Sequence, residues 1–245
     1  MQETLVQPLQ ALFSCNLSVV DQRVFFGGFM RDNWKKNASF SLQSFYSCNQ
    51  HRRLKPLSRC VEPLIEKCRQ SDIVAVKAIR LHMSYMDQLL SGDPDLRLIH
   101  LVRDPRGIVE SQRKIDPRKS RSMTDMRLNA ERTCKQMLTD CRIRRQLELK
   151  YPRRILLLRY EDLVTATDTV INDVYRGLQL QLAFPSNISG IIKEQLHASS
   201  ANGPFETRRT NGTLTATNWR RTIDSNLHEY ITDTCYELLD ELRYN

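Results

Sequence analysis

The chain has 245 residues, of which 40% are hydrophobic and 27% charged. These proportions are ordinary for a globular protein and exclude wholesale disorder. Lys and Arg outnumber Asp and Glu by 37 to 28, giving a formal net charge of +9. Such an excess favours an anionic partner, whether nucleotide, acidic glycan, nucleic acid or anionic membrane. No apolar run approaches the roughly 18 residues of a membrane span, and the N-terminal segment carries no secretory signal.

Three short apolar runs rich in β-branched residues predict strands, at Ile73–Ile79, Leu96–Val102 and Ile155–Tyr160. Each run is followed by a segment with helical character. Strands that alternate with helices favour an α/β fold with a parallel sheet flanked by helices. No internal repeat or long linker interrupts the pattern, so we expect a single domain over residues 1–245.

The predicted helices are Met83–Leu90, Pro105–Lys114, Met123–Lys150, Asp162–Leu180 and Ser225–Tyr244. The third is long and charged, and the last has an apolar stripe suited to closing the core. The first 60 residues show no clean period, and we expect them to be rich in loops.

The chain has seven cysteines, at positions 15, 48, 60, 68, 134, 141 and 235. Cys134 and Cys141 share one face of a predicted helix but lie about 10 Å apart along its axis, too far to bridge each other. The odd count leaves at least one thiol without a partner. No spacing typical of a metal site occurs. Four Asn-x-Ser/Thr sequons, at Asn16, Asn37, Asn187 and Asn211, favour the secretory lumen.

A strand followed by Arg103-Asp-Pro-Arg-Gly-Ile-Val-Glu-Ser111 is the sharpest local signal. Arg103 follows the strand's carboxyl end, where ligands of open α/β sheets bind. Asp104 can cap the next helix, and Pro105 suits its first turn. A helix start attracts anions, and a guanidinium grips a phosphate through two hydrogen bonds. The same pattern also fits a well-capped helix without a ligand, so the spacing alone leaves both interpretations open.

The segment Val102–Ser111 closely resembles the 3′-phosphate-binding motif of Golgi carbohydrate sulfotransferases, in particular the group that sulfates the 6-O of galactose, N-acetylgalactosamine or N-acetylglucosamine. Other segments resemble the family in the same order. They are Val76–Leu81, Leu158–Leu163, Thr207–Asn211 and Asn218–Arg220, with Cys235 in the last helix. The resemblance covers roughly residues 5 to 243.

The resemblance implies transfer of a sulfuryl group from 3′-phosphoadenosine-5′-phosphosulfate (PAPS) to a sugar hydroxyl, without a metal. By position, Arg103 and Ser111 would hold the donor's 3′-phosphate. The other positions that the resemblance places near the donor or the glycan are Arg209, Trp219, Arg220, Lys77 and Arg80. Lys77 and Arg80 fit equally well as charged residues that flank a strand. The resemblance implies residence in the Golgi, although this sequence carries no targeting signal.

Two family features are missing from the sequence. The family's Arg-x-Gly-Ser-Ser-Phe loop, which cradles the donor's 5′-phosphosulfate, does not occur. The stretch Leu5–Leu12 resembles the family segment that normally follows this loop, so we expect an N-terminally truncated domain of the P-loop-NTPase-like sulfotransferase fold, without its first strand. Gln7 stands where the family usually has Glu, and an amide cannot act as a general base. The catalytic base is therefore not identified.

The sequence supports two hypotheses. The first is a carbohydrate sulfotransferase, and the second is a non-catalytic relative that binds acidic glycan or nucleotide through a basic face. Nucleic-acid binding rests on charge alone, because no recognition helix or aromatic-basic motif accompanies it. Without the phosphosulfate loop, we expect this chain to bind the donor weakly or not at all.

Overall fold

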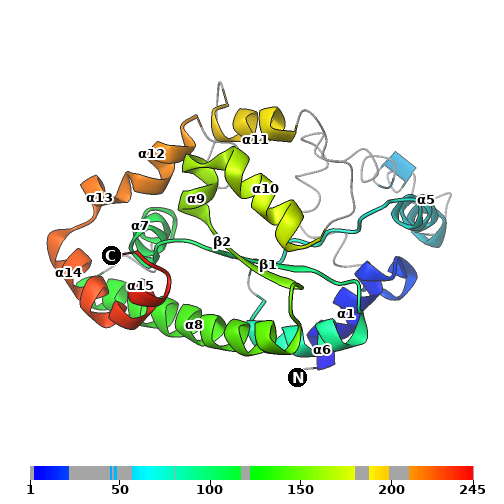
Figure 1. Cartoon of the computed structure of the whole chain (residues 1–245), viewed down its shortest axis with the longest axis horizontal. Coiled ribbons are helices and arrows are strands. Elements are labelled where there is room, and N and C mark those ends of the chain that lie inside the picture. Colours follow the sequence, from blue (N-terminus) through cyan, green and yellow to red (C-terminus); the bar gives the residue numbers. More distant parts are fainter. Residues whose placement is uncertain are drawn as a thin grey trace. The chain divides into compact units, whose positions relative to one another are not determined.

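The computed structural model describes residues 3–21, 45, 47–48, 57–79, 81–116, 122–179, 188–198 and 210–244. The chain divides into two compact units, Met1–Gly92 and Asp93–Asn245, and each is described by itself. Figure 1 labels the helices and strands. None of the described helices is both long enough and apolar enough to cross a bilayer.

The regular elements of the first unit are helical in the part of the chain that the structure describes. Its elements are α1 (Glu3–Phe13), the 3-10 turn η1 (Leu17–Val19), α5 (Leu57–Arg69), the 3-10 turn η2 (Met83–Tyr85) and α6 (Met86–Gly92). Disulfides join Cys15 to Cys68 and Cys48 to Cys60. A small core forms around Phe45, which is 1% exposed. Most of the segment expected to be loop-rich lies outside the described residues.

The predicted strand Ile73–Ile79 is wrong. No strand forms there, and the sheet among the described residues pairs only β1 with β2. Ile73 is 45% exposed and Ile79 is 77% exposed, so the run is not buried as a central strand would be. An extended segment becomes a strand only when a neighbour satisfies its backbone hydrogen bonds. That neighbour is not specified by the local sequence.

The second unit contains the sheet. The parallel strands β1 (Leu98–Val102) and β2 (Ile155–Arg159) pair in register, with Leu98 opposite Ile155 and Val102 opposite Arg159. Figure 1 shows them between the long helix α8 (Met123–Lys150) on one side and α9 (Tyr160–Thr165) with α10 (Thr167–Gly177) on the other. The predicted α/β class, a parallel sheet flanked by helices, is confirmed.

The remaining elements of this unit are α7 (Pro105–Ile115), α11 (Ile188–Leu196), α12 (Gly212–Thr217), α13 (Trp219–Thr222), α14 (Ser225–Thr234) and α15 (Tyr236–Glu241). Two helices predicted as continuous are each divided. The predicted helix Asp162–Leu180 is interrupted at Ala166, and Ser225–Tyr244 is interrupted at Cys235, where neither residue has helical backbone angles.

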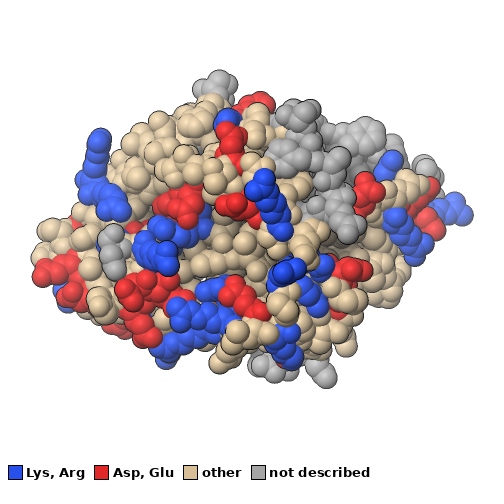
Figure 2. Space-filling model, in the orientation of Figure 1, with Lys and Arg blue, Asp and Glu red and all other residues tan. Residues whose placement is uncertain are grey.

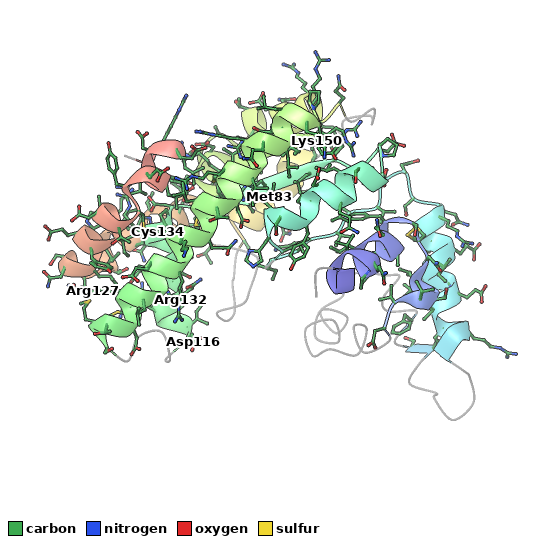
Figure 3. All side chains as sticks on the ribbon, turned by 90° about the horizontal axis from the view of Figure 1, so that it is seen from below. Met83, Asp116, Arg127, Arg132, Cys134 and Lys150 are labelled. Atoms are coloured by element: carbon green, nitrogen blue, oxygen red, sulfur yellow. A yellow bond between two sulfur atoms is a disulfide. The ribbon has the colours of Figure 1, made fainter. Side chains whose placement is uncertain are left out.

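The main core of the second unit lies between α8 and the C-terminal helices. Leu227 and Ile231 of α14 and Leu238 and Leu239 of α15 are each at most 1% exposed. Figure 3 shows Cys134 in the first half of α8, beside these helices, and Lys150 at its end. Cys134 is bonded to Cys235, so the prediction that it cannot bridge to Cys141 is confirmed.

The odd count predicted at least one thiol without a partner, and the structure identifies it as Cys141, which is fully buried. Burial raises the pKa of its thiol to about 11. The group therefore stays protonated near neutral pH and packs as a small apolar side chain. Its place in the core explains why an odd cysteine persists beside three disulfides.

Candidate anion site at the ends of β1 and β2

The candidate site lies where the two parallel strands end. Val102 and Arg159 are register partners, so the residues that follow them, Arg103 and Tyr160, emerge side by side. The guanidinium carbon of Arg103 lies 5.1 Å from the centre of the Tyr160 ring, a cation–π contact. Arg103 Nη2 also donates to the backbone oxygen of Thr215 in α12, at 2.9 Å. The strand ends and α12 therefore fix the orientation of this cation.

Arg103 has no counterion among the described residues. Its Nε is buried and has no hydrogen-bond partner. A guanidinium keeps its charge at any physiological pH, and a carbonyl and an aromatic face neutralise only part of it. The side chain thus retains positive charge and donor capacity at the carboxyl end of the sheet.

The first turn of α7 is already capped from within the protein. The Asp104 carboxylate accepts from the backbone N–H of Arg106 at 2.9 Å. The same carboxylate forms a two-pronged ion pair with the Arg106 side chain, through contacts of 3.0 and 2.8 Å. Both side chains are almost fully buried. The predicted cap is confirmed, and this carboxylate takes the place at the helix start where the sequence suggested that an anion could bind.

A network of buried and part-buried hydrogen bonds surrounds this cap. Arg106 also donates to the backbone oxygen of Tyr244 at 2.5 Å. Glu161 accepts from the backbone N–H of Asp104 at 3.1 Å and from the Tyr244 hydroxyl at 2.7 Å. Burial, followed by this bond to Glu161, raises the pKa of Tyr244. This hydrogen-bond network links both strand ends to the C-terminal segment and fixes the backbone next to Arg103.

Ser111 lies two turns along α7 and is half-buried. Its hydroxyl has no hydrogen-bond partner within the described part of the chain. The neighbouring Glu110 is 1% exposed. Burial alone would raise the pKa of Glu110, but hydrogen bonds from Arg113, Lys114 and Thr222 outweigh burial and lower it. Arg113 and Lys114, near the end of α7, are therefore paired with Glu110. Arg103 has no such carboxylate partner among the described residues.

Trp219 and Arg220, which the sequence places near the nucleotide donor, have unlike surroundings in the structure. Trp219 is buried, with Arg106 4.9 Å and Arg220 4.7 Å from its ring and His228 stacked on it at 6.0 Å. Its ring is therefore part of the packing of α13 and is not open to stack on a base. Arg220 is exposed at the start of α13.

The remaining predicted positions belong to the first unit or lie outside the described residues. Lys77 is exposed in the first unit, and Gln7 is exposed on α1. Arg80 and Arg209 lie outside the described residues. No group of acidic, cysteine or histidine side chains within the described ranges could hold a metal ion.

The sequence-based interpretation missed the contributions of Tyr160, Thr215 and Arg106. Tyr160 could have been found, because residues that follow paired parallel strands emerge at the same edge. The Arg106 pair also has a local signal in the Asp104-Pro-Arg106 spacing. The backbone oxygen of Thr215 has none, since no side chain marks it.

Comparisons with known proteins identify the family. A model described as "Sulfotransferase family" matches residues 13–184. Carbohydrate sulfotransferase 3 of Rattus norvegicus is 28% identical over 204 residues, which are 78% of this chain and 42% of that protein. Carbohydrate sulfotransferase 3 of Homo sapiens is 28% identical over 205 residues, with the same shares. Carbohydrate sulfotransferase 1 of Danio rerio is 27% identical over 197 residues, 73% of this chain and 46% of that protein.

The chain thus spans less than half the length of these relatives. No solved structure matches it. The family model covers well over half of the chain and includes both strand ends with Arg103 and Ser111. This chain belongs to the sulfotransferase family.

Proposed function

We propose that this protein is a carbohydrate sulfotransferase that transfers a sulfuryl group from PAPS to a sugar hydroxyl, the 6-O of N-acetylglucosamine, N-acetylgalactosamine or galactose. Family membership and relatives named as carbohydrate sulfotransferases support this reaction class. Three disulfides and the exposed sequon residues Asn16 and Asn211 support work in the secretory lumen, here the Golgi.

The observation that carries the proposal is the charge of Arg103. It lies at the carboxyl end of a parallel sheet, held by Thr215 and Tyr160, with a buried Nε that lacks a partner. A phosphate oxygen is the strongest acceptor for such a donor, because the bond joins two charged groups. Ser111, on the helix that follows directly, offers a hydroxyl with no other described partner. These two groups would hold the donor's 3′-phosphate.

In this role Arg103 and Ser111 would bind a part of the donor that does not react. Binding energy gained there can position the phosphosulfate and orient the leaving group. Sulfuryl transfer resembles phosphoryl transfer, in which positioning and charge neutralisation carry most of the catalysis. Arg209, Arg220, Lys77 and Arg80 remain proposed contacts to the donor or the glycan. The buried ring of Trp219 could act only by positioning Arg220.

The donor site can be tested by calorimetry of the full chain with adenosine 3′,5′-bisphosphate and with adenosine 5′-monophosphate. We expect the bisphosphate to bind more tightly, even if both affinities are low. Replacing Arg103 by Ala should reduce this preference about ten- to a hundredfold, because a charge-assisted hydrogen bond contributes about 1.5–3 kcal/mol. Arg132→Ala is the control, since Arg132 is an exposed arginine of α8 and loses the same charge.

Two results would contradict the proposal. The wild-type chain could bind both nucleotides equally, or Arg103→Ala could keep the preference. A non-catalytic relative that binds nucleotide or acidic glycan is the second candidate, favoured by Gln7, whose amide cannot accept a proton from a sugar. Preferential binding of the bisphosphate without transfer from PAPS to a desulfated glycan would select this second candidate.

A further inference from the structure

The outer edge of β2 has backbone groups that no other described segment pairs with. Leu98 N–H donates to Arg154 O at 2.8 Å, so Arg154, Leu156 and Leu158 direct their peptide groups toward β1. By alternation, Leu157 directs its N–H and C=O away from β1. No hydrogen bond from another described segment reaches these outward groups of Leu157. An edge of this kind is a template for another strand.

This edge borders a cavity of about 490 Å³. The cavity is lined by four consecutive residues of β2, Leu156 to Arg159. Side chains of consecutive strand residues point to opposite faces, so a cavity lined by all four must open at the strand's edge. The strand is therefore the floor of a groove, which we call the β2 edge groove. Figure 2 shows an uncharged strip between charged side chains on the face that carries β2 in Figure 1.

The two walls of the β2 edge groove carry opposite charges. One wall comes from α8, α15 and the turn that follows α15, and it contains the arginines Arg144, Arg145 and Arg243. Glu241 forms ion pairs with Arg144 and Arg145. The buried Nε of Arg144 has no hydrogen-bond partner among the described residues. Arg243 is exposed, and its side chain has no partner among the described residues.

The other wall comes from α9 and α10 and contains two acidic groups. Asp162 lies 3.8 Å from Arg159 Nε. Asp173 is exposed, and no described side chain pairs with it. Val170 and Val174 give the same wall an apolar part. A ligand in the groove thus meets a cation on one side and a carboxylate on the other.

We propose that the β2 edge groove binds an extended segment of another polypeptide as an added strand, with acidic side chains on one face and basic side chains on the other. An added strand lies about 4.8 Å from its neighbour and fills its open backbone bonds. Its alternating side chains reach both walls, so acidic residues meet Arg243 and basic residues meet Asp173. This inference is independent of sulfuryl transfer.

Neither a second copy of this chain nor an oligosaccharide fits these features as well. Two copies cannot pair their β2 edges directly, because each edge is the floor of a groove whose walls would collide. An oligosaccharide lacks the regular row of donors and acceptors that an open strand offers. A peptide supplies both the backbone pairing and the two-sided charge pattern.

The test is hydrogen–deuterium exchange of the full chain with a blocked octapeptide of alternating Glu and Lys. We expect slower exchange in residues 155–159 when the peptide is present. A peptide of identical sequence with every backbone nitrogen methylated should give no protection, because neither of its edges keeps an N–H donor. The reversal Arg243→Glu should weaken binding about fivefold, the size expected when a partly exposed attraction becomes a repulsion.

Arg153→Glu is the matched control for Arg243→Glu. Both arginines are exposed and have left-handed backbone angles, with φ of 64° and 55° respectively, but Arg153 does not line the groove. Equal protection by the N-methylated peptide would overturn the proposal, because charge alone would then explain binding. No protection of residues 155–159 at millimolar peptide would also overturn it. Protection by a chondroitin oligosaccharide but not by the peptide would assign the groove to a glycan.

Discussion

Replacing Gly107 by Ala places a methyl group against the buried Trp219 ring. An ideal Cβ at Gly107 would lie 2.8 Å from Trp219 Cδ1, 3.1 Å from Nε1 and 3.4 Å from Cγ. The indole is 4% exposed, with Arg106 and Arg220 packed against it. The ring therefore has little room to move without disturbing the Arg106–Asp104 pair.

Two effects of opposite sign decide the size of the change. Ala is favoured over Gly inside a helix by at most about 1 kcal/mol. Overpacking a tight buried contact costs about 1–3 kcal/mol. We expect the steric effect to dominate, so Gly107→Ala should lower the free energy of unfolding by about 1–2 kcal/mol. For a unit of this size that corresponds to a fall in Tm of about 2–8 °C.

The assay is urea and thermal unfolding followed by circular dichroism. Gly190→Ala in α11 is the control, because nothing lies within 4 Å of its ideal Cβ and only the helix preference acts there. We expect this control to be neutral or slightly stabilising. If Gly107→Ala were as stable as Gly190→Ala, the close packing of α13 on α7 would be refuted.

Two further predictions concern the core of the second unit. Replacing Cys134 and Cys235 by Ser should lower the free energy of unfolding by about 2–5 kcal/mol, because this disulfide closes a loop with a sequence separation of 101; an unchanged urea midpoint would argue against the bond. Burial lowers the pKa of His100, whose Nδ1 lacks a partner, so folding favours the neutral imidazole. The stability that the neutral imidazole of His100 gives to the fold is therefore present above about pH 6.5, the ordinary pKa of histidine. It is lost as the pH falls. Urea unfolding at pH 7 and pH 5 should show a larger loss for wild type than for His100→Phe, and equal losses would contradict the assignment.

Two helices that begin with a side-chain cap were predictable from the sequence. Asp104 caps α7 and Ser122 caps α8, each by accepting a backbone N–H. Both helices begin at the predicted residue. The strands at 98–102 and 155–159 were also found within two residues at each end, since a short apolar run between turn signals is typical of a strand.

The elements that the sequence predicted wrongly depend on contacts with residues far away in the chain. The run Ile73–Ile79 has strand-like composition, but composition does not provide a hydrogen-bonded neighbour. The predicted helix Ser225–Tyr244 is interrupted at Cys235, the residue bonded to Cys134 of α8. The local sequence shows the apolar stripe of both halves but does not show the interruption between them.

The candidate site was partly predictable for the same reason. Arg103 at the strand end follows from the order of strand, arginine and capped helix. Its contact with Thr215 joins residues 112 positions apart, and no periodic pattern encodes such a pair. The family resemblance predicts Trp219 near the nucleotide, and the structure packs its ring against Gly107. That contact needs the fold before it can be inferred.

The order of α8, α14 and α15 along the chain matters during synthesis. Seven of the twelve buried residues in the main core cluster lie between Leu227 and Tyr244. A ribosome releases these residues after α8, so α8 emerges with its apolar face and the Cys134 thiol uncovered until residues 227–244 follow. A nonsense codon shortly before Leu227 would therefore leave the apolar face of α8 and the Cys134 thiol exposed permanently. Such a product should become a substrate for chaperones and degradation.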